Sequence, residues 1–199
     1  MLKFFNRAKL AMLALGLTLV MLPAAAVVAQ DKTTEALGVP GPIQFAGGSY
    51  ALSWTSHPSA SYYKQEYLPD GQTSERYLSM FMLDVTTTGQ TVENAVSAHI
   101  SALEGRKSSD PMVNYNSIQN KQTGEVILDC ILSDTSGPEA VVEWDAYRYT
   151  PLGDGIAVFA ISQRAYGNDI EPFLANQVDA RQVSIGELAK LELPKVAPQ

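Results

Sequence analysis

Residues 76–86 read Arg-Tyr-Leu-Ser-Met-Phe-Met-Leu-Asp-Val-Thr, and this stretch decides the fold. Successive side chains of a β-strand point to opposite faces of its sheet. Apolar side chains occupy both faces here: Tyr77, Phe81, Leu83 and Val85 on one, and Leu78, Met80 and Met82 on the other. A strand that is apolar on both faces is covered on both faces. The sequence therefore predicts a central strand with other elements packed on each side of its sheet.

Strand-like segments joined by turns lie on either side of this stretch. Alternating or continuous apolar patterns predict strands at 49–56, 61–68, 113–119, 125–133, 140–150 and 155–165, with a short edge strand around 43–46. Turn sequences such as Pro69-Asp70-Gly71 separate the strands. Links this short join antiparallel neighbours.

Two segments have helical periodicity instead. In residues 91–105 apolar side chains recur at spacings of three and four, with Thr91 as a suitable N-cap and Gly105 as a suitable residue just past the end. Asp169 is expected to cap a second helix, on which one face carries Phe173, Leu174 and Val178. The order of elements predicts an α+β fold, a single antiparallel β-sheet of about six to seven strands flanked by helices on both faces.

The N-terminal residues have the pattern of a secretory signal peptide. Three basic residues precede the uncharged apolar run 10–22, which is short for a membrane span of about 20 residues. Small residues predict cleavage after Ala29, with cleavage after Ala26 or an uncleaved anchor as alternatives. The predicted divisions are a signal peptide 1–29, a flexible leader 30–48, a single α+β domain 49–193 and a C-terminal tail 194–199. We expect export to the bacterial periplasm or the extracellular space, with no stable membrane span after cleavage.

Composition excludes several classes of protein. The formal charge is −7, and cleavage after Ala29 makes it −10 because it removes Lys3, Arg7 and Lys9 and no acidic residue. An acidic chain does not bind nucleic acid through a basic face. One Cys and two His exclude a disulfide framework and a zinc site built from several Cys and His ligands. No cofactor is expected.

The arrangement of these elements resembles a known family. A strand ending in residues 54–58, strands to Thr86, a helix opening at Thr91, a four-strand meander and a C-terminal helix follow the signal peptide. This order resembles the PsbP-like and DcrB-like α/β/α sandwich proteins over about residues 43–182. The resemblance implies a non-enzymatic accessory, scaffold or binding role and supplies no catalytic residues. We therefore expect a secreted or periplasmic, non-enzymatic accessory or binding protein with a protein partner in the cell envelope.

Aromatic residues suggest an alternative function. They gather on two of the predicted strands, as Tyr62, Tyr63 and Tyr67 and as Trp144, Tyr147 and Tyr149. Amphipathic rings of this kind line grooves for a small ligand or glycan. Aromatic residues also favour strands for packing reasons alone, and ordinary sheet packing is the preferred interpretation.

Carboxylates suggest a second alternative. Glu143 and Asp145 point the same way from one predicted strand, and Asp129 lies within another. Three carboxylates close together bind Ca²⁺ or act as the acid and base of an uncharacterised hydrolase. The preferred interpretation is a solvated acidic face, or ion pairing with Arg148 and Arg164.

The remaining nucleophile and ligand candidates have ordinary structural explanations. Cys130 lies on the apolar face of its strand and is expected to be a buried, inert thiol. His99 falls on the apolar stripe of the first helix, and His57 precedes a proline at the end of a strand, where it is expected to be solvated. Ser49 follows two glycines but has no base near it in the sequence.

Overall fold

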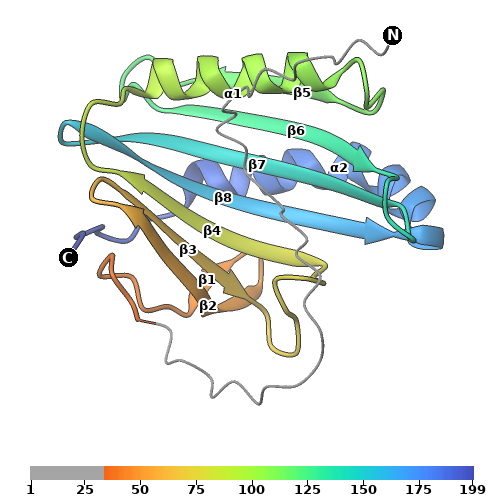
Figure 1. The fold of residues 1–199 in the computed structure, drawn as a ribbon, viewed down its shortest axis with the longest axis horizontal. Helices are drawn as coiled ribbons and strands as arrows, with labels where there is room; N and C mark the ends of the chain where they lie inside the picture. Colours follow the sequence, from red (N-terminus) through yellow and green to blue (C-terminus); the bar gives the residue numbers. More distant parts are fainter. Residues whose placement is uncertain (1–33) are drawn as a thin grey trace, which may run out of the picture. The chain divides into compact units, whose positions relative to one another are not determined.

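The computed structural model describes residues 34–199, and the predicted signal peptide lies outside the described residues. Figure 1 shows the order of the elements along the chain. They are β1 (Ile43–Phe45), β2 (Gly48–Ser59), β3 (Tyr62–Leu68), β4 (Ser79–Thr86), α1 (Val92–Arg106), β5 (Asn114–Gln119), β6 (Val126–Asp134), β7 (Val141–Leu152), β8 (Gly155–Tyr166), the 3-10 turn Gly167–Asp169 and α2 (Ile170–Lys190).

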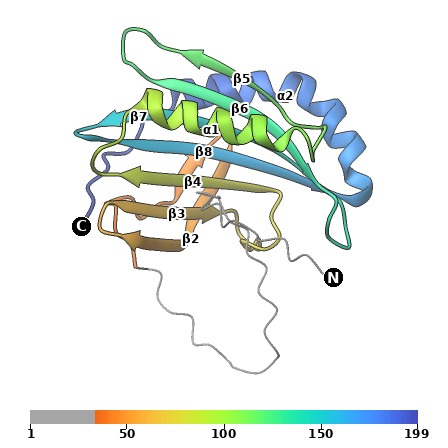
Figure 2. The ribbon, with the colours of Figure 1, turned by 45° about the horizontal axis from the view of Figure 1, so that its top comes forward.

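All eight strands belong to one antiparallel sheet in the order β1-β2-β3-β4-β8-β7-β6-β5. The central pair is β4 and β8, which pair without interruption from Ser79 opposite Gln163 to Thr86 opposite Ile156. Since β4 lies in the middle and β5 at an edge, α1 crosses one face of the sheet to connect them, as Figure 2 shows. Neither helix of the described residues is long and apolar enough to cross a membrane.

The sheet is strongly curled, like half of a barrel. The ring of Phe45 on β1 lies 5.7 Å from the ring of Phe81 on β4. In a flat sheet β1 and β4 would stand about 14 Å apart, three strand spacings. The curl therefore brings the first strands over the inner face of the central strands, where Phe81, Leu83 and Val85 are buried.

The predicted PsbP-like α/β/α sandwich, with six to seven strands flanked by helices on both faces, is wrong. The described chain contains eight strands in one curled sheet and only two α-helices, each of which covers only part of one face. The inner face is covered largely by the curled strands themselves and by Leu37 and Val39, which precede β1. Phe173, Ile185 and Leu188 of α2 add to this cover. The error lies in assuming that burial on both faces requires two helical layers, because a curled sheet covers part of its own surface.

The outer face is covered in part by α1. Val92, Val96 and Leu103 of this helix pack with residues of β6 and β7. Thr91 is confirmed as the N-cap, since its side chain accepts a hydrogen bond from the backbone N–H of Asn94. Gly105 does not end the helix as predicted, because α1 continues to Arg106.

Two strand boundaries also differ from the prediction. β4 begins at Ser79, so Leu78 is 61% exposed and Tyr77 packs on the outer face with Met80 and Met82. β2 continues through Pro58, although proline cannot donate a ladder hydrogen bond. The pairing of β2 with β3 is irregular between Ser56 and Ser59, and this irregularity accommodates the missing donor.

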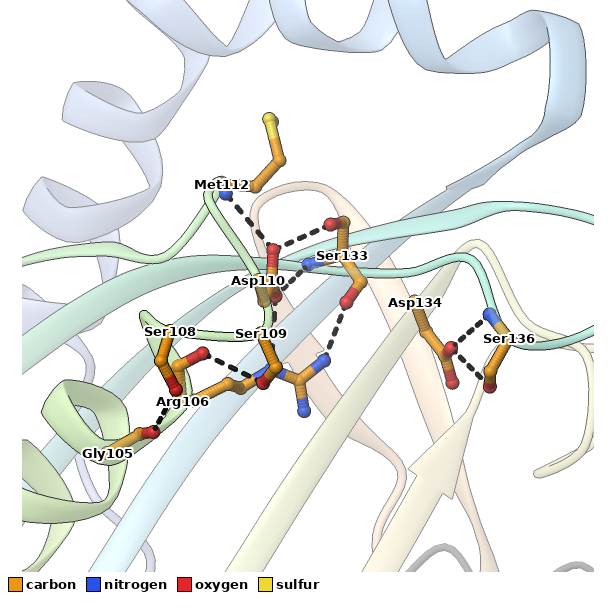
Figure 3. Close-up of polar contacts among 9 residues, drawn as sticks. All are labelled: Gly105, Arg106, Ser108, Ser109, Asp110, Met112, Ser133, Asp134 and Ser136. Carbon is orange, nitrogen blue, oxygen red and sulfur yellow. Dashed lines mark hydrogen bonds and ion pairs between the residues drawn. The ribbon is translucent and has the colours of Figure 1, made fainter.

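Asp110 anchors the link between α1 and β5 onto β6, as Figure 3 shows. Its carboxylate accepts hydrogen bonds from the backbone N–H of Ser133 at 2.7 Å, from the Ser133 hydroxyl at 2.7 Å and from Arg106 Nε at 3.0 Å. Arg106 also donates to the Ser133 carbonyl oxygen. These contacts set where β5 begins relative to β6.

Gly155 allows β4 to pass close to the β7–β8 hairpin. A Cβ at this position would lie 1.9 Å from the carbonyl oxygen of Thr86, which is backbone and cannot move aside alone. The neighbouring Gly153 has a φ of +59° and open space around its Cβ position. Gly153 therefore serves the turn, whereas Gly155 serves packing between strands.

We expect Gly155→Ala to destabilise the fold by about 2 kcal/mol or more, because the new methyl group overlaps the backbone of β4. Gly153→Ala is the matched control and should cost only about 1–2 kcal/mol, the strain of a left-handed alanine. Urea unfolding at pH 7 measures both values. A larger loss in the Gly153 variant would contradict the packing role of Gly155.

We expect Asp110→Asn to cost about 2–3 kcal/mol at pH 7, because hydrogen bonds to a charged acceptor are lost. Burial alone would raise the pKa of Asp110, but the hydrogen bonds from Ser133 and Arg106 hold it below its usual value. The stabilisation should therefore be complete above the unfolded pKa of about 3.9 and be lost as the pH falls through the lower folded value.

Asp134→Asn is the control, and urea unfolding measures the free energy of both variants. Asp134 is exposed and accepts hydrogen bonds only from Ser136 within its own turn among the contacts drawn in Figure 3. Its substitution should change the unfolding free energy by less than about 0.5 kcal/mol. Equal effects of the two substitutions would show that Asp110 does not anchor the link.

Candidate functional site

The six aromatic candidates do not form one groove. Tyr63, Tyr67 and Trp144 are buried in the inner cluster, whereas Tyr147 and Tyr149 are buried in the outer cluster beside α1. Tyr62 is half-buried, and its hydroxyl donates to Asp84. The rings therefore belong mainly to the packing of the two faces.

The three carboxylate candidates are divided between the faces as well. Asp129 lies opposite Ala146 in the register of β6 and β7, and Asp145 lies opposite Cys130. Because neighbouring positions alternate between faces, Asp129 points to the side of α2, while Glu143 and Asp145 point to the other side. Among residues 34–199, no group of three or more His, Cys, Asp or Glu side chains is arranged to hold a metal ion.

Glu143 belongs to a polar cluster on the outer face. Arg164 forms an ion pair with its carboxylate and stacks over the ring of Tyr77 at 4.2 Å. The Tyr77 hydroxyl donates to Glu143 Oε2 at 3.1 Å and contacts the Ser162 hydroxyl at 3.1 Å. The pairing of Glu143 with Arg164 is the structural alternative that the sequence suggested.

Asp145 lies beneath this cluster and is almost completely buried, with 1% of its surface exposed. Within the described part of the chain, neither of its carboxylate oxygens has a hydrogen bond partner. Burial, and then the negative charge of Glu143, raise the pKa of Asp145 well above its usual range. Burial therefore favours the protonated, neutral form of Asp145, which is sealed from solvent.

The remaining candidates take the structural roles expected of them. Cys130 is 2% exposed, and burial raises the pKa of its thiol, which makes it a poor nucleophile. His99 is half-buried, with Nδ1 2.6 Å from the Tyr149 hydroxyl, and burial lowers its pKa. His57 is exposed and stacks on Tyr63.

A pocket of about 180 Å³ lies between α2 and the strands β5, β6 and β7, and we call it the α2 pocket. Its lining comprises Asn114, Tyr115, Asp129, Ile131, Trp144, Leu174, Gln177, Val178 and Arg181. Val178 is 71% exposed, so the pocket opens to solvent beside it. One aromatic candidate, Trp144, and one carboxylate candidate, Asp129, thus meet in this pocket.

An ion pair forms the polar centre of the α2 pocket. Arg181 Nη2 lies 2.7 Å from Asp129 Oδ2, and Trp144 Nε1 donates to the same oxygen at 3.4 Å. Burial raises the pKa of Asp129, and the nearby Arg181 charge opposes this effect. The pair leaves one atom of each partner unused, because Asp129 Oδ1 and Arg181 Nε are buried and have no partner among residues 34–199.

Gln177 places a third polar atom without a partner in the same pocket. Its Nε2 donates to Gln163 Oε1 at 2.8 Å, which fixes the amide. Its Oε1 is buried and unpaired within the described residues. A wider hollow of about 660 Å³ at the N-terminal end of α1 contains no such atom among the residues described. The α2 pocket is therefore the candidate functional site, because a buried unpaired polar atom is costly unless something binds it.

Packing and hydrogen bonds hold α2 in place beside the pocket. Ile185 and Leu188 are buried against the inner face. Arg148 on β7 donates to the carbonyl oxygens of Leu188 and Leu191, both at 3.0 Å, and pairs with Glu125. These bonds satisfy carbonyl groups that the end of a helix leaves free. The helix is thus anchored at its C-terminal end, and its middle turns form one wall of the pocket.

The sequence contained a signal for this site that the predictions did not use. Leu174, Gln177, Arg181, Ile185 and Leu188 follow each other at spacings of three and four, which places two polar residues in the middle of an apolar stripe. Val178 was expected to share the apolar face, but it is exposed at the pocket rim. A polar pair on a buried stripe indicates a buried polar site opposite it.

A protein-family model matches residues 37–193, which is most of the chain, and the protein belongs to this family of unknown function. The matched region includes all eight strands, both helices and every residue that lines the α2 pocket. No curated protein and no solved structure matches the chain.

We expect Asp145→Asn to remove part of the pH dependence of stability. The pKa of Asp145 is higher in the folded protein than in the unfolded chain, where it is about 3.9, so unfolding releases a proton at pH values between the two. The wild-type unfolding free energy should therefore fall as the pH rises, by up to about 1.4 kcal/mol per pH unit, until the folded pKa is reached. Urea unfolding between pH 5 and 8 measures this slope.

Asp70→Asn, in the exposed turn after β3, is the control and should parallel the wild type. The Asp145 variant should show the flatter profile. Identical slopes for all three proteins would show that Asp145 is ionised in the folded state.

Proposed function

We propose that the protein is a non-enzymatic binding protein that holds a small polar ligand in the α2 pocket. The observation that carries this proposal is that three residues lining the pocket each have a buried atom without a partner in the described residues, namely Asp129 Oδ1, Gln177 Oε1 and Arg181 Nε. A ligand that bonds all three removes a cost of roughly 1–3 kcal/mol for each neutral group and more for the charged ones.

The chemistry of the lining supports recognition over catalysis. Gln177 is neither an acid nor a base, and Asp129 is already engaged by Arg181. Such groups orient a ligand by donating and accepting hydrogen bonds. Leu174, Ile131 and the ring of Trp144 provide apolar surface beside them. A small apolar pocket with a few placed polar groups is typical of ligand sites.

Export is part of the proposal and is supported by the signal pattern of residues 1–29. The formal net charge of −7 favours solubility and so accords with an exported binding protein. A protein partner in the cell envelope stays a prediction from the family resemblance. The aromatic groove and the carboxylate hydrolase are not favoured, because their residues are divided between the two faces of the sheet.

Nuclear magnetic resonance provides a direct test, because the chain has two tryptophans. Trp144 lines the pocket and its indole N–H contacts Asp129, whereas Trp54 lies on β2 and is 44% exposed. We expect members of a library of small polar fragments to shift the indole N–H signal of Trp144 and leave that of Trp54 unchanged.

Two variants on α2 serve as a matched pair for this titration. Arg181→Gln removes the positive charge from the pocket. Val183→Ser changes a residue on the same helix that is 65% exposed. Binding should weaken at least tenfold in the first variant and be unchanged in the second. If no fragment moves the Trp144 signal, or if the two tryptophan signals move together, the α2 pocket is not a ligand site.

A further inference from the structure

The three unpaired atoms of the α2 pocket define a hydrogen-bonding pattern for the ligand. Asp129 Oδ1 and Gln177 Oε1 are acceptors, and Arg181 Nε is a donor. The complementary ligand carries a group with at least two N–H or O–H donors and, separately, an acceptor. A hydrocarbon satisfies none of these atoms, and a simple anion has no donor for the two acceptors.

The charges in the pocket add a second restriction. Asp129 and Arg181 carry opposite charges, and no other charged residue lines the pocket among those described. The pocket is therefore neutral overall but has a negative and a positive side. A charged hydrogen bond is shorter and about twice as strong as a neutral one. A ligand gains most when it places a positive group at Asp129 and a negative group at Arg181.

The size of the pocket places a third restriction on the ligand. A volume of about 180 Å³ is slightly larger than the engineered cavity of about 150 Å³ that holds benzene. It therefore accommodates roughly six to eight non-hydrogen atoms by the same comparison. Leu174, Ile131 and Trp144 also line this volume and provide apolar surface, which suits a short aliphatic side chain.

We propose that the α2 pocket binds a small zwitterionic amino acid with a short aliphatic side chain. The ammonium group donates to Asp129 Oδ1 and Gln177 Oε1, and the carboxylate accepts from Arg181 Nε. The aliphatic group rests against Trp144 and Leu174. This inference rests on the proposed ligand-binding function and names the chemical class of the ligand.

Four related compounds test the proposal on the full exported chain. L-alanine carries both charges, propionate lacks the ammonium group, L-alaninamide lacks the carboxylate, and propanamide is neutral. Each is titrated while the indole N–H signals of Trp144 and Trp54 are followed. We expect L-alanine to bind at least tenfold more tightly than each of the other three and to shift the Trp144 signal alone.

Substitutions assign the two ends of the ligand. Asp129→Asn should weaken L-alanine binding at least tenfold while changing propionate binding less than threefold. Gln177→Met removes the second acceptor for the ammonium group. It is used for the same comparison if the Asp129→Asn variant does not fold. Val183→Ser is the control and should bind L-alanine as the wild type does.

The outcomes separate this inference from the function on which it rests. If propionate, L-alaninamide or propanamide binds as tightly as L-alanine, the zwitterion proposal is overturned while ligand binding in the pocket stands. If neither these compounds nor the fragment library shifts the Trp144 signal, both proposals fail. Equal weakening of L-alanine and propionate by Asp129→Asn also overturns the assignment of the ammonium group.

Discussion

The uninterrupted pairing of β4 with β8 is the constraint on which the rest of the structure depends. These strands join the two meanders β1–β4 and β5–β8 into one sheet, and both are buried on both faces for most of their length. The pairing continues to the end of β4 only because Gly155 has no side chain where the Thr86 carbonyl passes. With this pair in the centre, the outer strands curl and bring Phe45 of β1 onto Phe81 of β4.

The curl also explains why the inner face has a pocket near β5 and β6. The first strands and the residues before them cover β4 and β8, while α2 covers β7 and β6 from the opposite end. Arg148 fixes the C-terminal end of α2, and Ile185 and Leu188 fill the space below it. Towards its middle the helix presents the polar residues Gln177 and Arg181 beside Leu174 and Val178. The sheet and helix therefore separate around polar groups, and a pocket remains.

The two buried carboxylates of the strands β6 and β7 show how environment decides chemical role. Within the described residues the buried oxygens of Asp145 have no cationic partner, so burial favours its neutral form and its role is structural. Asp129 is also buried, but it pairs with Arg181 and lines the α2 pocket, which reaches solvent beside Val178. Asp129 and Asp145 lie on neighbouring strands, but their side chains point to opposite faces of the sheet. The face therefore separates Asp145, a structural group, from Asp129, the proposed recognition group.

Much of the local structure was determined by the sequence alone: the two-faced strand around Phe81 and Leu83, the N-cap at Thr91, the edge strand near Ile43 and the burial of Cys130. These features depend on alternation, capping and turn residues, which act over a few positions. Tertiary structure decided the curl of the sheet, the cover of each face and the separation of Asp129 from Asp145. Strand register and the placement of α2 join residues distant in the chain, such as Asp129 and Arg181, and no local pattern in either segment specifies which partner it meets.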